Sequence, residues 1–338
     1  MNMTAAVYRR FGAPEVVRLE QRAVPTPKPG EVLLRVQAST VSVADHRARA
    51  RARDIPSGLG VPASLGIGLF RPSHRILGMD AAGVIEAVGP GAAGFAPGNR
   101  VIAMTGAGFG GHAEYVCLPA DGAIARAPES MTAGEAVTLV FGGLTARGFL
   151  AQTAIEAGTT VLVNGASGAV GTAAIQLAKQ LGAQVTAVTS GANAALVAAL
   201  GADRVIDYTR SDFAAEGGTY DVILDCVGNA PFERVEGLLA PGGALLLVIS
   251  DLRSMLRSRG QGRRSGKLVS WKAGRPGADD LAYLAGLADA GRYRAVIDRT
   301  FALAEIVQAH RYVDTGRKRG NVVLRIADPG PESVLPGE

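Results

Sequence analysis

The sequence has little of what several protein classes require. Aromatic residues make up 5% of the 338 residues, and Lys and Arg exceed Asp and Glu by only 35 − 30 = 5. Nucleic-acid binding relies on denser positive charge and on stacking rings, so we do not expect a dedicated nucleic-acid-binding protein. The two cysteines, Cys117 and Cys226, lie far apart and form no CxxC motif. They exclude a disulfide framework and a cysteine-rich zinc lobe, and they favour a reducing compartment.

Signals for secretion or membrane insertion are also missing. Arg9 and Arg10 interrupt the N-terminal segment where the apolar core of a signal peptide would lie. Residues 157–178 and 180–202 are long enough to span a bilayer and carry no charge, but Asn, Ser, Gln and Gly interrupt them. We predict that both windows form buried strands and helices, and that the protein is cytoplasmic.

Apolar residues and glycine are plentiful, at 48% hydrophobic residues and 45 glycines. The length suggests about two domains. Up to about residue 126, short apolar segments separated by turns predict an antiparallel barrel or sandwich. These segments are residues 32–38, 82–88, 100–104 and 113–118.

From about residue 159, apolar strands alternate with helical patterns, which predicts a doubly wound parallel sheet of the α/β class. The expected strands are residues 160–164, 184–189, 205–208, 221–227 and 244–250. Helices are expected at residues 170–181, 194–200 and 231–239. The tail is expected to contain an edge strand at 267–272, a helix at 278–289, a strand at 295–301, a helix at 304–315, a strand at 321–326 and a frayed end.

A glycine-rich turn carries the strongest functional signal. Gly165, Gly168 and Gly171 follow the first of these strands with the spacing GxxGxxG and open an amphipathic helix. Such glycines allow a tight turn and let the backbone approach a pyrophosphate, whose charge the helix N-terminus favours. Ala169 stands where a hydrolase G-x-S-x-G elbow needs glycine, and no Walker lysine follows. The pattern therefore predicts a dinucleotide site.

The second strand of this sheet bears on the choice of dinucleotide. NAD sites usually carry an acidic residue about twenty positions beyond the glycines. Residues 189–193 contain none, so a 2′-phosphate is permitted, with Ser190 and Asn193 as neutral donors and NADPH as the favoured cofactor. That turn has no Lys or Arg. Tertiary folding is needed to bring in Tyr208, Arg210, Lys318 and Arg319, which are otherwise ordinary solvated side chains.

Ordered motifs along nearly the whole chain resemble the medium-chain dehydrogenase/reductase superfamily, and within it the zinc-independent quinone oxidoreductase-like branch. They include GAPEVVRLE, PTPKPGEVLLRVQAS, ILGMDAAGVIEAVG, VLVNGASGAVGTAAIQLAKQLGA, YDVILDCVGN and AVIDRTFAL. The resemblance implies a GroES-like β-barrel domain of residues 1–126 and 276–338, with an inserted Rossmann NADP-binding domain of residues 127–275. It also implies a cleft between them and a homodimer, with residues 267–272 as a possible contact strand.

The same resemblance implies positions for the cofactor residues. The diphosphate would meet the glycine turn at Ser167, Gly168, Ala169 and Val170, Thr145 would lie near the nicotinamide, and Val227 and Ile249 would approach the ribose and nicotinamide. The tail from Lys318 to Val322, with Arg319 and Asn321, would reach back to the cofactor.

No metal is expected. Zinc-dependent relatives use a Cys three residues before an Asp, a G-H-E segment and a later Cys. This chain has Ser42 before Asp45, and Gly78-Met79-Asp80 in place of G-H-E. A tetrahedral site needs about three protein ligands, and Asp80 is the one candidate retained. The four histidines show no ligand spacing and are expected to be ordinary core or surface residues.

Without zinc to polarise a carbonyl, we expect an acceptor that takes hydride with weaker electrophilic help, such as a quinone or a conjugated enone. Many relatives carry N-P-x-D where this chain has Ser42 to Asp45. Ser42 is a candidate donor to the oxyanion and His46 a candidate proton source, unless His46 points outward beside the arginines. Asp45 is expected to orient its neighbours, and Tyr115 to be structural.

Two basic tracts border the expected cleft. They comprise Arg47, Arg49, Arg51 and Arg53, and then Arg253, Arg257, Arg259, Arg263, Arg264 and Lys267. They are either solvated loops or a surface that captures an anionic acceptor or an acidic membrane near a lipid-like quinone. Residues 61–70 are either a lid or a loop packed on the barrel.

The leading hypothesis is an NADPH-dependent, zinc-independent reductase of quinones or enones. An aldehyde or ketone reductase and a non-catalytic NADPH-binding scaffold are the alternatives.

Overall fold

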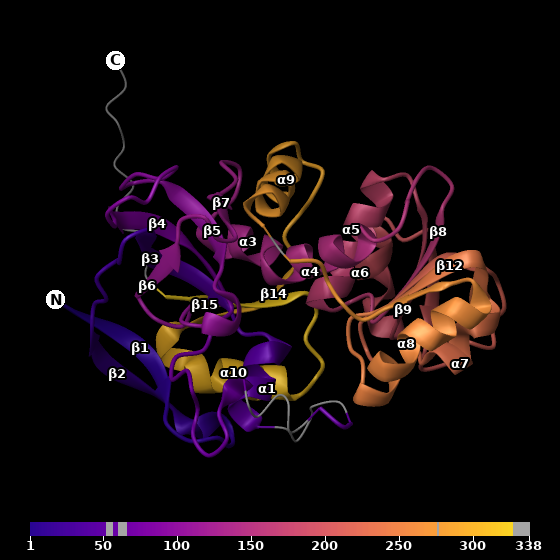
Figure 1. Cartoon of the computed structure of the whole chain (residues 1–338), viewed down its shortest axis with the longest axis horizontal. Helices are drawn as coiled ribbons and strands as arrows, with labels where there is room; N and C mark the ends of the chain where they lie inside the picture. The colour runs from indigo at the N-terminus through magenta and orange to yellow at the C-terminus, as the bar shows by residue number, and fades with distance from the viewer. Residues whose placement is uncertain (52–56, 60–65, 276, 327–338) are drawn as a thin grey trace.

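The computed structural model describes residues 1–51, 57–59, 66–275 and 277–326. Figure 1 shows two bodies side by side, with the N-terminus and residues 321–326 on the same body. Arg53, residues 61–65 of the expected lid segment and the expected frayed end lie outside the described ranges.

A seven-stranded sheet forms the first body, with the order β14-β15-β3-β4-β5-β7 and with β6 paired to β3. The strands are β3 (Glu31–Thr40), β4 (Asp80–Val88), β5 (Arg100–Met104), β6 (Tyr115–Pro119), β7 (Ile124–Arg126), β14 (Ile297–Ala302) and β15 (Asn321–Arg325). Strand β15 runs antiparallel to β3, so the end of the chain completes the N-terminal sheet. A separate hairpin of β1 (Asn2–Tyr8) and β2 (Val17–Ala23), which the apolar pattern did not indicate, lies beside it.

The second body is the predicted parallel sheet, with the order β10-β9-β8-β11-β12-β13. Its strands are β8 (Thr160–Asn164), β9 (Gln184–Thr189), β10 (Arg204–Asp207), β11 (Tyr220–Asp225), β12 (Leu239–Leu247) and β13 (Leu268–Ser270). Every neighbouring pair is parallel, which confirms the Rossmann arrangement. The GroES-like and Rossmann fold class expected from the sequence is therefore confirmed.

Helices cover both sheets. They are α1 (Val43–Ala50), α3 (Ala133–Ala136), α4 (Phe141–Leu150), α5 (Ala169–Gln180), α6 (Ala194–Ala199), α7 (Phe232–Val235), α8 (Leu252–Ser265), α9 (Ala278–Asp289) and α10 (Ile306–Asp314). Short 3₁₀ turns are η1 (Pro14–Val16), η2 (Gly106–Gly108), η3 (Val137–Leu139), η4 (Gly191–Asn193), η5 (Glu236–Leu238) and η6 (Leu303–Glu305). No helix among the described residues combines the length and the apolar character needed to cross a bilayer.

Helix α8 corrects the expectation of a solvated loop for the second basic tract. The Asp251 side chain accepts a hydrogen bond from the Ser254 amide at 2.7 Å and so caps the first turn. Gly266 ends the helix in the left-handed region, at φ 67°. Both caps are readable in the sequence, but the dense arginines between them obscured the helical pattern.

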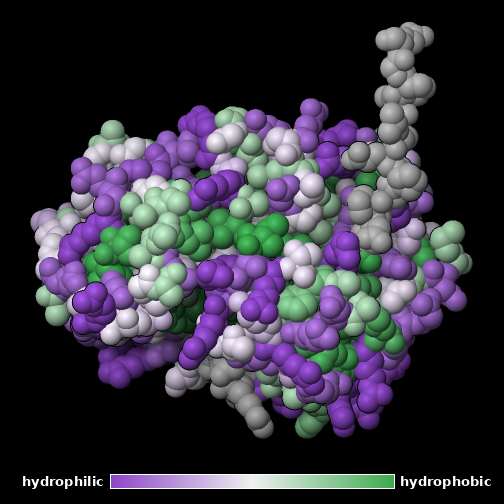
Figure 2. Space-filling model, turned by 180° about the vertical axis from the view of Figure 1, so that it is seen from behind, coloured by the Kyte–Doolittle hydropathy of each residue, from purple (hydrophilic) through white to green (hydrophobic). Residues whose placement is uncertain are grey.

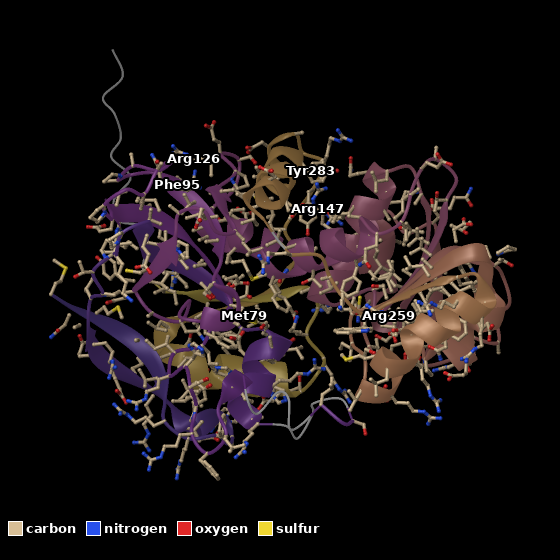
Figure 3. All side chains as sticks on the ribbon, viewed as in Figure 1. Met79, Phe95, Arg126, Arg147, Arg259 and Tyr283 are labelled. Atoms are coloured by element: carbon tan, nitrogen blue, oxygen red, sulfur yellow. The ribbon has the colours of Figure 1, made fainter. Side chains whose placement is uncertain are left out.

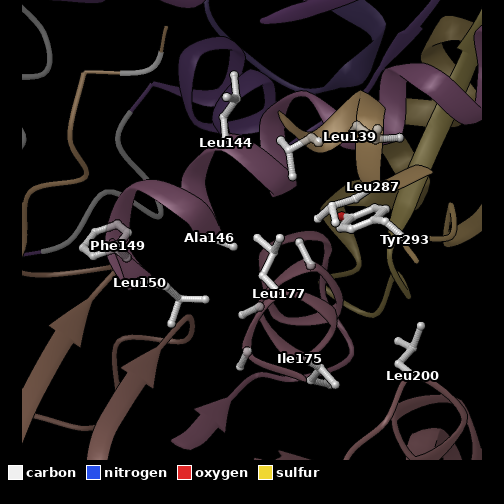
Figure 4. Packing of buried hydrophobic residues seen from close by; sticks show 14 of the residues in the cluster. Leu139, Leu144, Ala146, Phe149, Leu150, Ile175, Leu177, Leu200, Leu287 and Tyr293 are labelled. Atoms are coloured by element: carbon white, nitrogen blue, oxygen red, sulfur yellow. The ribbon is translucent and has the colours of Figure 1, made fainter. Parts of the chain in front are cut away.

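One continuous apolar core joins the two bodies. It includes Ala38 and Ile102 of the first sheet, Val161 and Leu224 of the second, and the helices between them. Helices α4 and α5 pack closely at Gly142, where a larger residue would not fit. A Cβ added at Gly142 would lie 2.6 Å from the Ala169 carbonyl oxygen. Figure 4 shows Ala146 and Leu150 of α4 near Leu177 of α5. The cleft walls are therefore fixed to a shared support.

The surface carries local contacts that hold α9 to this support. The Arg147 guanidinium lies 4.0 Å from the centre of the Tyr283 ring and 2.6 Å from Asp280 Oδ1, and Figure 3 shows Arg147 and Tyr283 close together.

The reverse face of the molecule presents a band of hydrophobic residues between hydrophilic margins (Figure 2).

Truncation of the α5 core contact is expected to destabilise the whole chain. Leu177→Ala removes a buried side chain from the joint core and should lower the free energy of unfolding by about 3 kcal/mol. Leu181→Ala is the matched control, because Leu181 is 42% exposed, and it should cost less than about 0.5 kcal/mol. Urea unfolding followed by circular dichroism measures both, and equal losses would contradict the assignment of the core.

Candidate active site

A cleft of about 1170 Å³ lies where the two bodies meet. Its walls include Ser42 at the start of α1, Thr145 of α4, and Val227 and Ile249 beyond the ends of β11 and β12. The glycine turn and the C-terminal tail line it as well. Ligands of doubly wound sheets bind at this carboxyl edge, so the fold places the cleft where a dinucleotide is expected.

The three glycines of the turn play different parts. Gly165 has φ +79°, and a Cβ there would lie 2.7 Å from Val227 Cγ2. A Cβ at Gly171 would lie 2.3 Å from the Gly165 carbonyl oxygen. At Gly168, the N-cap of α5, the nearest atom would be 3.5 Å away, so the space beside it is open to the cleft. The turn thus fits a pyrophosphate that approaches the backbone at Gly168 and the N-terminus of α5.

The C-terminal tail contacts this turn directly. Gly168 and Gly320 form a parallel β-bridge, and the Gly320 amide donates to the Ser167 carbonyl oxygen at 2.7 Å. Lys318 and Asn321 line the cleft beside the turn. The structure therefore brings together two groups of expected cofactor residues that lie about half the chain apart.

Lys318 is the cation of this tail that faces the cleft. Its Nζ donates to the Gly320 carbonyl oxygen at 2.7 Å. Burial lowers the pKa of Lys318 to about 8, against the opposing pull of Asp298 and Asp80. Arg319 is placed differently, because it does not line the cleft and its guanidinium lies 3.4 Å from Asp298 Oδ1.

At the adenosine end, the Asn193 amide joins two expected cofactor residues. Its Nδ2 donates to Ser167 Oγ at 3.1 Å and to Ser190 Oγ at 3.2 Å. Tyr208 lines the cleft, whereas Ser190 and Asn193 stand just behind the lining residues.

Asp207, which the sequence pattern did not single out, also lies at this turn. A Cβ added at Gly191 would lie 2.5 Å from Asp207 Oδ2. Hydrogen bonds from the Thr209 hydroxyl and amide hold the pKa of Asp207 below its usual range, so the group is a carboxylate. It ends β10 rather than following β9, so a search about twenty residues beyond the glycines misses it.

Ser42 and Asp45 form a capping box at the start of α1. The Ser42 hydroxyl donates to Asp45 Oδ2 at 2.6 Å, and the Ser42 amide donates to the same oxygen at 2.8 Å. Asp45 Oδ1 accepts from the Gly78 amide at 2.8 Å. Asp45 is fully buried, so it holds Ser42 at the cleft wall without lining the cleft itself.

His46 is not among the residues that line the cleft. Its Nδ1 lies 2.5 Å from Asp314 Oδ1, and Arg49 Nη2 donates to both Asp314 oxygens at 2.6 Å. These groups connect α1 to α10, and none of the three lines the cleft. The structure therefore separates His46 from Ser42, although both lie in one short segment.

The positions at which zinc-dependent relatives hold their metal have a donor set that does not fit zinc. Asp80 is fully buried and accepts from the Thr40 amide at 2.7 Å, the Thr40 hydroxyl at 2.6 Å and the Ser39 hydroxyl at 3.2 Å. Burial raises the pKa of Asp80 to about 7, a value that favours a partly protonated group. Met79, labelled in Figure 3, stands in the histidine position. Across the described ranges, no three His, Cys, Asp or Glu side chains are grouped as metal ligands.

Comparisons with known proteins identify the family. A profile described as "Alcohol dehydrogenase GroES-like domain" matches residues 28–129, and one described as "Zinc-binding dehydrogenase" matches residues 200–324. The chain is 32% identical to "Quinone-oxidoreductase QR1, chloroplastic" from Triphysaria versicolor, over 95% of this chain and 98% of that protein. It is 28% identical to "2-methylene-furan-3-one reductase" from Solanum lycopersicum, over 95% of this chain and 79% of that protein.

The solved structures show the same relationship. The quinone oxidoreductase from Coxiella burnetii superposes with a TM-score of 0.84 at 28% identity. The superposition covers 97% of this chain and 100% of that one.

Two alanine substitutions in the turn are expected to separate folding from cofactor binding. Gly171→Ala forces a Cβ against the Gly165 carbonyl and should lower stability by about 2 kcal/mol. Gly168→Ala meets no close atom, so the fold should keep its melting temperature while dinucleotide affinity falls about tenfold. Thermal melts and fluorescence titration with NADPH measure these effects. Unchanged affinity of the Gly168 variant would place the diphosphate elsewhere.

Proposed function

Because the chain belongs to the quinone oxidoreductase-like branch of the medium-chain dehydrogenase/reductase superfamily, we propose that it reduces a quinone or an α,β-unsaturated carbonyl with NADPH and without catalytic zinc. The single observation that carries this proposal is the cleft itself. There an open glycine turn for the dinucleotide, with Lys318 beside it, shares the cleft with Ser42, which stands where zinc-dependent relatives have a ligating cysteine.

The acceptor's chemistry follows from the rest of the lining. Aromatic and aliphatic side chains make up much of this lining, among them Phe109, Phe141, Phe149 and Trp271. Such a lining favours a flat, conjugated and largely apolar molecule over a small hydrophilic aldehyde. The curated relatives include a quinone oxidoreductase and a reductase of a conjugated furanone, which supports the same class.

The reduction leaves negative charge on the acceptor's oxygen, and two residues are placed to receive it. The bound nicotinamide would supply a hydride, which carries both electrons of the reduction. The Lys318 ammonium is one hydrogen-bond donor of the cleft wall. Ser42 Oγ becomes a second donor when its hydroxyl turns from Asp45 Oδ2 toward the acceptor's oxygen. Lys318 then passes a proton from Nζ to the oxygen and is reprotonated from solvent, as its lowered pKa of about 8 permits.

The proposed preference for NADPH rests on the absence of an acidic side chain, which would repel a 2′-phosphate, from the turn after β9. The turn after β9 offers Ser190 and Asn193 and no carboxylate of its own, so a 2′-phosphate is accepted. Asp207 lies behind Gly191, and the turn contains no Lys or Arg. We therefore expect a modest preference for NADPH over NADH.

Two structural expectations accompany the function. We propose that residues 1–126 and 276–338 form the GroES-like domain around a Rossmann domain of residues 127–275. Among the described strands, β13 pairs only with β12 and leaves one edge open. This edge is the proposed contact of a homodimer.

Cofactor oxidation at 340 nm against a panel of acceptors tests the function. We expect turnover with quinones and enones, faster with NADPH than with NADH, and unchanged after metal chelation. Turnover with aldehydes alone favours the aldehyde reductase, and NADPH binding without oxidation of any acceptor favours the scaffold. Stoichiometric zinc that is required for activity would overturn the proposal.

Lys318→Met is expected to lower kcat about a hundredfold, because the cleft loses its proton donor. In the wild-type enzyme the rate should fall as the pH rises through about 8, since only the ammonium form donates a proton. That alkaline limb should vanish in Lys318→Met and in Lys318→Arg, which keeps the charge but does not titrate in this range. Exposed Lys28→Met is the control. Retention of the alkaline limb in the Lys318 variants would contradict the assignment.

A further inference from the structure

The net positive charge of the chain is accounted for by one segment. Residues 251–267 contain six Arg and Lys and one Asp, a net charge of 6 − 1 = +5. The other residues contain 35 − 6 = 29 basic and 30 − 1 = 29 acidic side chains, so they carry no net charge. The net charge of +5 for the whole chain therefore resides on α8 and the turn that follows it.

The arginines of this segment point to solvent. Five are on α8 itself, all exposed, namely Arg253, Arg257, Arg259, Arg263 and Arg264. Within the described ranges one of them has an ion-pair partner, Arg257, whose Nη1 lies 3.6 Å from Glu233 Oε1. Figure 3 labels Arg259 on the side of α8 nearer the first body.

The same face of α8 carries an apolar residue that the fold does not use. Leu256 is 75% exposed and lies among these arginines on the helix surface. The buried face is polar instead, with Ser258 and Gln261, and Gln261 Nε2 donates to Glu233 Oε1 at 3.1 Å. Helix α8 thus presents cations and one leucine outward, so its outer face is complementary to a negatively charged surface that also has an apolar layer.

Helix α8 begins beside the cleft. The Leu252 amide donates to the Ser57 carbonyl oxygen at 3.0 Å, and Leu59, two residues beyond Ser57, lines the cleft. A second cavity of about 400 Å³ shares Val227 and Ile249 with the cleft and is also lined by Ser254 in the first turn of α8. A surface bound by α8 would therefore lie close to the cleft.

From these observations we infer that the outer face of α8 docks on an anionic phospholipid bilayer and places the cleft next to lipophilic acceptors dissolved in it. Each arginine near an acidic membrane contributes electrostatic attraction, and the exposed leucine adds apolar contact. A nucleic acid fits less well, because α8 has no ring to stack on bases and leaves the leucine in water. Docking stands independently of the activity, whereas delivery of the acceptor rests on the proposed function.

Vesicle co-sedimentation tests the docking. The full chain should bind vesicles that contain about one third phosphatidylglycerol but not pure phosphatidylcholine, and it should dissociate at high salt. A variant with Gln at Arg253, Arg259, Arg263 and Arg264 should bind these vesicles at least about a hundredfold more weakly than the wild type. The control variant loses the same charge at exposed sites elsewhere, with Gln at Arg10, Arg18, Arg71 and Arg75, and should bind like the wild type.

Leu256→Ser changes no charge and should weaken vesicle binding several-fold. Equal loss in the α8 and control variants, or full binding by the α8 variant, would overturn the docking surface. Full binding by Leu256→Ser, or tighter binding to single-stranded RNA or to an acidic polypeptide than to vesicles, would overturn the choice of a bilayer. Thermal melts check that each variant is folded.

Two acceptors separate docking from catalysis. With a soluble short-chain quinone, the α8 variant should match the wild-type rate, because its changed residues lie outside the cleft lining. With a long-chain quinone embedded in anionic vesicles, its rate should fall in parallel with binding. Equal rates on the embedded quinone would overturn delivery, and failure of the wild type with both acceptors would refute the proposed function while vesicle binding still stood.

Discussion

The site depends on one backbone contact between distant parts of the chain. The Gly320 amide donates to the Ser167 carbonyl, and Gly320 bridges Gly168 at the second glycine of the turn. This contact attaches the last strand of the barrel to the first loop of the nucleotide sheet. It places Lys318 and Asn321 in the cleft and gives the turn a neighbour that belongs to the other body. The cleft thus forms where the two sheets are joined by hydrogen bonds, and the core around α4 and α5 supports it from below.

Local pattern was sufficient for the nucleotide sheet. Strands β8 and β9 begin and end at the predicted residues, because a strand buried on both faces is a continuous apolar run bounded by turn residues. The β1–β2 hairpin was missed because Arg and Glu residues along β2 weaken its apolar pattern. The sequence does not indicate helix α8, because its buried face is made of Ser and Gln and lacks the apolar periodicity that marks most helices.

The site shows the same division between local and tertiary information. The glycine turn was predictable because glycines at this spacing after a strand are typical of a tight turn that binds a pyrophosphate. The placement of His46 was not, since its partner Asp314 belongs to α10, 268 residues further along the chain. Asp207 was missed because its approach to Gly191 arises from two strands that are adjacent only in the sheet. The hydrogen-bond donors to Asp80 likewise come from β3, which is adjacent to β4 in the sheet but about forty residues away in the sequence.

The pairing of β15 with β3 has a consequence for the order in which the chain matures. Strand β3 can find β4 and β6 early in synthesis, but its remaining edge waits for residues near the C-terminus, where Arg325 pairs with Ala38. The Rossmann sheet, by contrast, contains all its own strands and can fold while the ribosome is still adding the tail. The nascent protein therefore carries an incomplete barrel with an unpaired β3 edge until β15 has been synthesised, a stage at which a chaperone could cover that edge.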